Sequence, residues 1–135
     1  MTLPIVSGMT AGAVLILQMA LMSNVASARA RLEQSLGDGG KDEMQRVIRR
    51  HGNLAENSGL FIAGFALLEL LGGNRLAVIA LCAAFVGARV LHVLGLSRTD
   101  TNNNFRGYGA IATAVIGIIL GCYLILISVA LLATA

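Results

Sequence analysis

The sequence predicts an all-α membrane protein, folded as a bundle of four transmembrane helices. Hydrophobic residues make up 56% of the 135-residue chain and charged residues only 13%, which leaves too little polar surface for a water-soluble domain of this length. The apolar residues gather in four segments: residues 3–28, 57–71, 76–96 and 107–135. Crossing the hydrocarbon core of a bilayer takes about 20 helical residues. We therefore expect a single domain over residues 1–135.

The first helix is expected over residues 3–31. Pro4 suits the first turn of a helix, where its missing N–H is not needed, and Arg29 marks the exit into water. No positively charged region precedes the apolar run, so we expect this helix to stay in the mature protein rather than to be cleaved as a signal peptide. Gly8 and Gly12 form a GxxxG pair, for which close helix packing and chance spacing are both open interpretations.

The second helix is expected over residues 42–71. Its apolar part is too short to cross a bilayer, so the helix has to begin upstream, within the polar segment 46–56. The glycine-rich stretch 37–40 does not continue a helix readily and predicts a flexible linker. Asp42 and Glu43 follow that linker, where acidic side chains complement the positive end of a helix dipole.

The third helix is expected over residues 76–96 and the fourth over residues 105–134. A short Gly-Gly-Asn turn precedes the third helix, and Glu69 and Arg75 flank that turn as ordinary interfacial charges. The segment 97–104 is polar and predicts the loop between the last two helices.

The loops differ in their content of basic residues. Most of the basic residues lie in or beside the first and third loops: Arg29, Arg31, Lys41, Arg46, Arg49, Arg50, Arg98 and Arg106. The second loop offers only Arg75. By the positive-inside rule, the first and third loops are cytoplasmic and both termini lie on the outer side.

Two classes of site are not expected. Cys82 and Cys122 lie in apolar runs without metal-ligand spacing and are predicted to be small buried hydrophobes, so we predict neither a metal site nor a disulfide. The net charge of +3 is modest, and no basic cluster is interleaved with aromatic residues. We therefore expect no nucleic-acid partner.

A polar stripe is predicted on the second helix. At about 100° per residue, Arg49, Asn53 and Glu56 lie on one face, at i, i+4 and i+7. Spanning a membrane requires no such groups, and ionisable residues at membrane depth are costly enough to indicate a functional site. Arg89 and His92, near the far end of the third helix, fall at the same membrane level.

The chemistry of these groups predicts the kind of ligand. Arg49, Arg89 and Arg106 offer planar guanidinium forks that suit carboxylates, and Glu56 can receive an ammonium group. The combination predicts a small zwitterion with excess carboxylate, such as an amino-acid derivative or a short acidic peptide, beside a co-substrate dissolved in lipid. A structural alternative stays open, in which Glu56 pairs with Arg89 or Arg106 and joins two helices.

The segment Arg49-Arg-His-Gly-Asn-Leu-Ala-Glu56, which opens the second of four membrane helices, resembles the RxxxNxxE signature of the MAPEG family. These are the membrane-associated proteins in eicosanoid and glutathione metabolism. The resemblance covers nearly the whole chain, because Ser27-Ala-Arg29, Ala88-Arg89 and Phe105-Arg106 also fall where family members carry similar elements. It implies a homotrimer of four-helix subunits that binds glutathione between neighbouring subunits near the cytoplasmic face.

The resemblance also implies roles for individual residues. The residues implied to bind glutathione are Arg49, Asn53, Glu56, Arg89 and His92, with Arg29 and His51 contributed by the adjacent subunit. Arg106 matches the arginine that stabilises the glutathione thiolate in several members, and this makes it the candidate catalytic residue. A nearby cation lowers the pKa of a thiol from its usual value of about 8.5, so that the thiol becomes a better nucleophile at neutral pH.

The implied function is that of a glutathione transferase or peroxidase acting on lipophilic electrophiles. The chain departs from the family pattern at Asn57, His92 and Leu96, where enzymes with well-defined glutathione sites commonly place tyrosines. Two alternatives are kept. A small multidrug-type transporter would use Glu56 as its proton-coupled carboxylate, and a non-catalytic, lipid-binding membrane protein would keep the MAPEG fold without the reaction.

Overall fold

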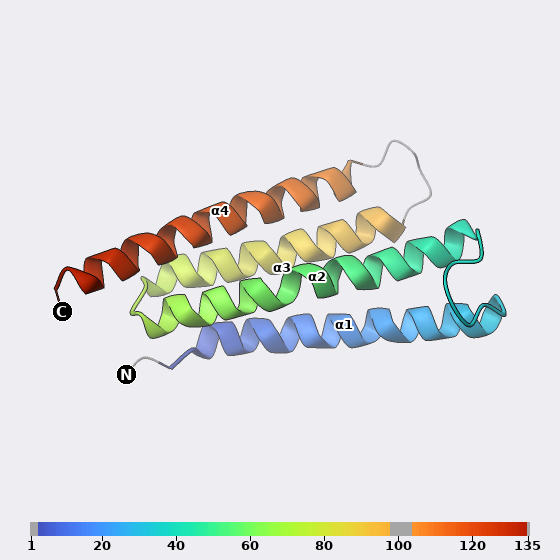
Figure 1. Cartoon of the computed structure of the whole chain (residues 1–135), viewed down its shortest axis with the longest axis horizontal. Helices are drawn as coiled ribbons and strands as arrows, with labels where there is room; N and C mark the ends of the chain where they lie inside the picture. The colour runs from blue at the N-terminus through green and yellow to red at the C-terminus, as the bar shows by residue number, and fades with distance from the viewer. Residues whose placement is uncertain (1–2, 98–103, 135) are drawn as a thin grey trace.

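A computed structural model describes residues 3–97 and 104–134 of the chain. The described residues form four helices and no strand: α1 (Ile5–Arg31), α2 (Asp42–Leu70), α3 (Arg75–Ser97) and α4 (Phe105–Leu132) (Figure 1). The predicted fold class, an all-α bundle of four helices, is confirmed. Arg98, predicted in the third loop, lies outside the described residues.

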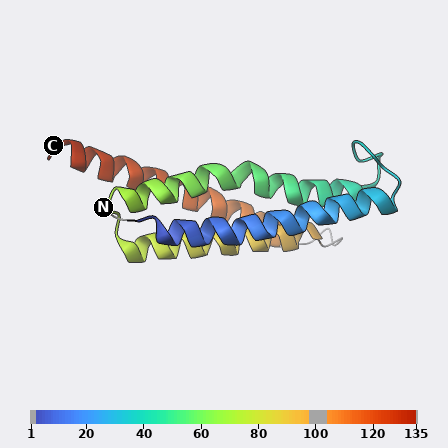
Figure 2. The ribbon, with the colours of Figure 1, turned by 90° about the horizontal axis from the view of Figure 1, so that it is seen from below.

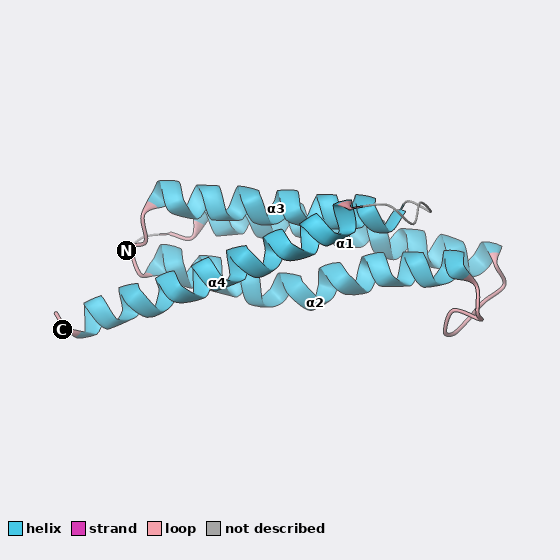
Figure 3. Ribbon diagram, turned by 90° about the horizontal axis from the view of Figure 1, so that it is seen from above, coloured by secondary structure: helices cyan, strands magenta, loops and turns pink. Residues whose placement is uncertain are grey.

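The four helices lie roughly side by side, with α2 and α3 between α1 and α4 (Figure 1). The loop after α1 and the start of α4 lie at one end of the bundle, and both chain ends lie at the other (Figures 1 and 2). Among the described residues α1 and α4 do not touch, whereas α3 makes extensive contact with α4 and α1 with α2. Figure 3 shows α4 beginning beside the end of α3 and running obliquely toward the side of α2.

Three of the helices, α1, α3 and α4, are long and apolar enough to cross a membrane. The remaining helix, α2, has the length but not the composition, because its first half carries the polar segment 46–56. The chain is therefore an integral membrane protein with three apolar spans, and α2 is the less apolar fourth member of the bundle.

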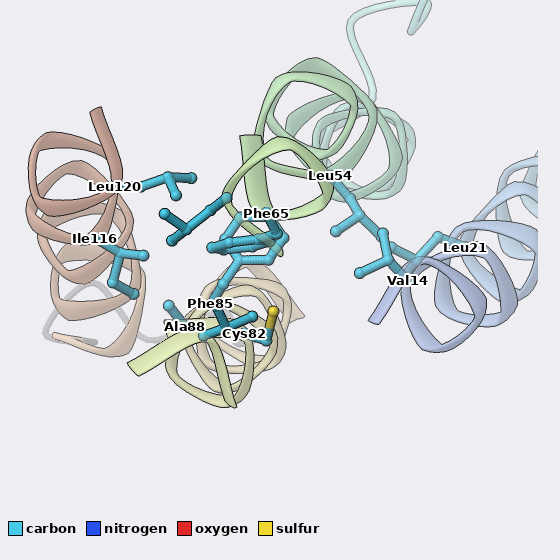
Figure 4. Packing of buried hydrophobic residues seen from close by; sticks show 11 residues of the cluster. Val14, Leu21, Leu54, Phe65, Cys82, Phe85, Ala88, Ile116 and Leu120 are labelled. Carbon is cyan, nitrogen blue, oxygen red and sulfur yellow. The ribbon is translucent and has the colours of Figure 1, made fainter. Parts of the chain in front are cut away.

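An aromatic cluster forms the centre of the core between α2 and α3. The rings of Phe61 and Phe85 stack with centroids 4.4 Å apart. Phe65 meets Phe85 edge-on, with centroids 5.7 Å apart (Figure 4). Ring pairs of this kind contribute about 0.5–1.5 kcal/mol beyond the area that they bury. Cys82 is buried in the same core, as predicted, but Cys122 is exposed, because that side of α4 faces away from the other helices.

Two glycines let α3 and α4 approach each other closely at the end that carries the polar residues. A Cβ atom on Gly109 would lie 2.7 Å from the backbone nitrogen of His92, and one on Gly95 would lie 2.7 Å from the Cα atom of Arg106. Both positions therefore require glycine. The predicted GxxxG pair on α1 differs, since Gly8 and Gly12 have no atom within 4 Å of a Cβ built on either residue.

The end of α1 and the start of α2 form a hairpin that extends beyond α3 and α4 (Figure 1). Arg29 Nη1 donates to the carbonyl oxygens of three residues of the connecting loop, at 3.1–3.2 Å: Gln34, Ser35 and Gly37. Arg31 forms an ion pair with Glu43. This hydrogen-bonded guanidinium holds the pKa of the Glu43 carboxyl below its ordinary value.

At the opposite end, Glu69 joins α2 to the start of α1. Its carboxylate accepts hydrogen bonds from the backbone N–H groups of Val6 (3.1 Å) and Ser7 (2.7 Å) and from the Ser7 hydroxyl (2.5 Å). An acidic group at a helix N-terminus satisfies unpaired N–H groups and interacts favourably with the helix dipole. The prediction of an ordinary interfacial charge at Glu69 is therefore wrong, because this side chain fastens one helix to another.

Candidate active site

A cleft of about 350 Å³ lies where α2, α3 and the first turns of α4 meet. The described residues that line it are Arg49, Asn53, His92, Leu96, Arg106 and Ala110. Four of these belong to the predicted site, and they come from three different helices. The fold thus brings together residues that are up to 57 positions apart in the chain, from Arg49 to Arg106.

The α2 side of the cleft is made by Arg49 and Asn53, which lie one helical turn apart. Asn53 Nδ2 donates to the backbone oxygen of Arg49 at 3.1 Å, so the amide is held against its own helix. Arg49 is exposed on α2. This geometry follows directly from the i, i+4 spacing in the sequence.

The other side of the cleft is made by His92 on α3 and Arg106 on α4. His92 Nδ1 lies 3.1 Å from the backbone oxygen of Arg106. A carbonyl oxygen only accepts hydrogen bonds, so Nδ1 carries a hydrogen and donates it. The close approach that Gly95 and Gly109 allow places the start of α4 within reach of this ring.

Arg89 is almost completely buried, with 3% of its surface exposed, and it does not line the cleft. Its Nη2 atom donates to the backbone oxygen of Gly109 at 3.2 Å and to the hydroxyl of Thr113. That hydroxyl in turn donates to the Gly109 oxygen at 2.7 Å. Arg89 therefore holds α4 against α3, one turn away from the cleft residues.

The remaining predicted residues lie outside this cleft in the single chain. Glu56 is exposed on α2, and its Oε1 atom lies 3.9 Å from a Cβ built on Gly52, so its side chain turns back along its own helix. The backbone oxygen of His51 accepts a hydrogen bond from Gln18 Nε2 at 3.4 Å. No ion pair between Glu56 and either Arg89 or Arg106 is present in the described part of the chain.

The three positions that depart from the family pattern have distinct surroundings. Asn57 Nδ2 donates to the backbone oxygen of Asn53 at 2.9 Å, along α2. Leu96 lines the cleft and contributes only carbon atoms from its side chain. His92 lines it as well and contributes polar ring nitrogens.

The cleft is suited to an anion. Among the described residues that line it, two carry guanidinium groups, Arg49 and Arg106, and none carries a carboxylate. Guanidinium groups are permanently charged and offer several donors in a plane, which matches the geometry of a carboxylate.

Sequence reasoning missed the glycines that shape this site. Gly95 and Gly109 are required by the contact between α3 and α4, and neither belongs to a GxxxG pair. A signal was present, because Arg89, His92 and Gly95 recur at intervals of three residues on α3. Such a spacing marks one face of a helix.

Comparison with family models gave one finding that bears on identity. The model of the MAPEG family matches residues 7–127, a range that includes the cleft residues on α2, α3 and α4. No curated protein and no solved structure matched the chain. The family match covers most of the 135 residues, and the chain therefore belongs to the MAPEG family.

Proposed function

We propose that this protein is an integral membrane, glutathione-dependent transferase or peroxidase that conjugates or reduces lipophilic electrophiles. The observation that carries the proposal is the cleft at which Arg49, Asn53, His92 and Arg106 meet. Membership of a family of membrane transferases and isomerases associated with glutathione supports it at a coarser level.

Within this proposal glutathione is the co-substrate, and the two arginines have different tasks. Arg49 binds a carboxylate of the tripeptide through its planar fork, assisted by the Asn53 amide. Arg106 stabilises the thiolate, because a cation beside the sulfur lowers the pKa of the thiol. The hydrogen bond from His92 Nδ1 to the backbone oxygen of Arg106, at 3.1 Å, holds the backbone of Arg106 in place.

The proposed assembly is a homotrimer with its glutathione sites between subunits near the cytoplasmic face. In that arrangement Glu56, which is exposed in the single chain, binds the ammonium group of glutathione. Arg29 and His51 act from the neighbouring subunit. The hydrogen bonds from Arg29 to the loop carbonyls fix the shape of the hairpin between α1 and α2, which in this arrangement lies at the subunit interface.

An apolar groove between α2 and α4 supports the proposal that the second substrate is lipid-soluble. The groove measures about 270 Å³, and its lining includes Leu60 and Phe61 of α2 and Gly117 of α4. Leu60 follows Asn53 by seven residues, which places the groove about 10 Å deeper along the helix at about 1.5 Å per residue. We propose that the electrophile reaches the sulfur from this side.

The test uses the purified protein in detergent or in lipid nanodiscs. We expect glutathione binding by calorimetry, and glutathione-dependent turnover of an activated aryl halide or of an organic hydroperoxide, which separates transferase from peroxidase. Arg49→Ala is expected to weaken binding by about tenfold to a hundredfold, the loss of about 1.5–3 kcal/mol for a charged hydrogen bond. Arg106→Ala is expected to reduce thiolate formation while glutathione still binds.

The matched control is Arg75→Ala, which removes an exposed arginine at the opposite end of the bundle. It should leave both binding and turnover unchanged. Absence of glutathione binding to the wild-type protein refutes the proposed function for this ligand.

A further inference from the structure

One polar atom at the cleft has no partner. His92 is 93% buried, since only 7% of its surface is exposed, and its Nε2 atom has no hydrogen-bond partner among the described residues. Buried side-chain nitrogens are nearly always paired, so an unpaired nitrogen on a residue that lines a cleft is a place where a ligand can supply the missing partner. The ring lines the cleft together with Arg49 and Arg106.

The bond at the other ring nitrogen decides what Nε2 can do. Nδ1 donates its hydrogen to the Arg106 backbone oxygen, so in the neutral ring Nε2 carries the lone pair and accepts. The same bond holds the ring in one orientation against the start of α4. The pairing of an oriented imidazole with a carbonyl is the usual way in which a protein fixes the accepting nitrogen.

Apart from His92, no side chain among the described lining residues can accept a proton from a thiol. Arg49 and Arg106 are permanently protonated, and the Asn53 amide is not basic. Leu96 and Ala110 carry no polar side-chain atom. Among the described lining residues, His92 is therefore the one whose side chain carries a basic lone pair that can take a proton.

We propose that His92 is the base that takes the thiol proton of bound glutathione. This inference rests on the proposed function and assigns to His92 a step that Arg106 cannot perform. The S–H bond breaks, its proton forms an N–H bond at Nε2, and the electron pair stays on sulfur beside Arg106. The cations that surround the ring are Arg49 from α2, Arg89 from its own helix and Arg106 from α4.

The later steps need no reactant other than glutathione, the electrophile and water. With an aryl halide, the thiolate forms a carbon–sulfur bond, and the halide leaves with the electrons of the bond that breaks. The imidazolium then returns its proton to water. With an electrophile that takes up the thiolate at a carbon–carbon double bond, the same proton passes from Nε2 to the carbanion that forms.

The test counts protons on the wild-type protein. Glutathione binding at pH 7 is measured by calorimetry in buffers of different ionisation enthalpy, which gives the protons released per site, and thiolate formation is followed by its ultraviolet absorbance. At this pH a free thiol with a pKa of about 8.5 is almost fully protonated. If His92 keeps the proton, thiolate appears with close to zero protons released. Release of one proton per thiolate overturns the inference and leaves the proposed function standing.

A variant separates the base from the structural bond. In His92→Asn, the amide nitrogen takes the place of Nδ1 and can still donate to the Arg106 oxygen, whereas no atom replaces Nε2. We expect kcat to fall about 100-fold or more, the usual contribution of a general base, with little change in KM. Thiolate formation as complete as in the wild type overturns the inference. Failure of the wild type to bind glutathione removes both the inference and the proposed function.

Discussion

The contact between α3 and α4 at Gly109 can be tested by adding a single methyl group. In Gly109→Ala the new Cβ would lie 2.7 Å from the His92 backbone nitrogen and 2.8 Å from the Ala88 backbone oxygen. An ordinary contact begins at 3.4 Å, so the helices have to separate by several tenths of an ångström. Both neighbours are backbone atoms, and no side-chain rotation can relieve the clash.

The cost of this substitution follows from two opposing effects. Replacing glycine by alanine inside a helix stabilises it by about 1 kcal/mol. Overpacking a close contact costs about 1–3 kcal/mol. We therefore expect Gly109→Ala to lose stability by up to about 2 kcal/mol, and to fall below a variant without the clash by about 1–3 kcal/mol.

The chain offers a closely matched control two residues away. Gly107 lies on the same helix, and a Cβ added to it would have no atom within 4 Å, so Gly107→Ala should keep or raise stability. The free energy of unfolding is measured for both variants in mixed micelles with increasing denaturing detergent. Gly109→Ala as stable as Gly107→Ala would show that α3 and α4 do not approach this closely. Because the clash displaces the turn that carries Arg106, turnover should fall in Gly109→Ala only.

Two further predictions concern the ends of the bundle. Glu69→Gln removes the charge that accepts hydrogen bonds from Val6 and Ser7, and we expect the free energy of unfolding to fall by about 1–2 kcal/mol. Glutathione affinity should not change, since the cleft lies at the other end of the bundle. An unchanged unfolding midpoint would contradict this role. At the hairpin, the pKa of Glu43 is lowered in the fold, so its pairing with Arg31 stabilises above the ordinary glutamate pKa and is lost as the pH falls through the lowered value. The protection of the hairpin amides against exchange, after correction for the intrinsic effect of pH on the exchange rate, should therefore fall on acidification in the wild type but not in Glu43→Gln.

Much of the fold follows from local sequence pattern. Helix lengths and boundaries depend on apolar runs, on turn residues and on the cost of placing polar groups in lipid, all of which act over a few neighbouring residues. The polar first half of α2 is expected because the apolar remainder alone is too short to cross a bilayer. The stripe of Arg49 and Asn53 is equally predictable, since both positions depend only on helical periodicity.

The candidate site was only partly predictable, because it depends on how helices pack. Glu56 shares a helix with Arg49 and Asn53, yet it lies outside the cleft, since the packing of α3 and α4 decides which part of a stripe is covered. Periodicity within α2 contains no information on that packing. The hydrogen bond from His92 to the Arg106 backbone is equally inaccessible, because it joins two helices whose distance depends on Gly95 and Gly109.

The buried guanidinium of Arg89 links the packing of α4 to the chemistry of the cleft. A cation this deep in a membrane protein usually has a carboxylate partner, but the described residues offer it only neutral acceptors, the Gly109 oxygen and the Thr113 hydroxyl. Neutral acceptors compensate a buried charge incompletely, so maximal stability does not explain this residue. Its bonds instead fix α4 against α3 one turn beyond Arg106, and a cation held there adds to the positive potential at the cleft. Both effects favour an anion beside Arg106.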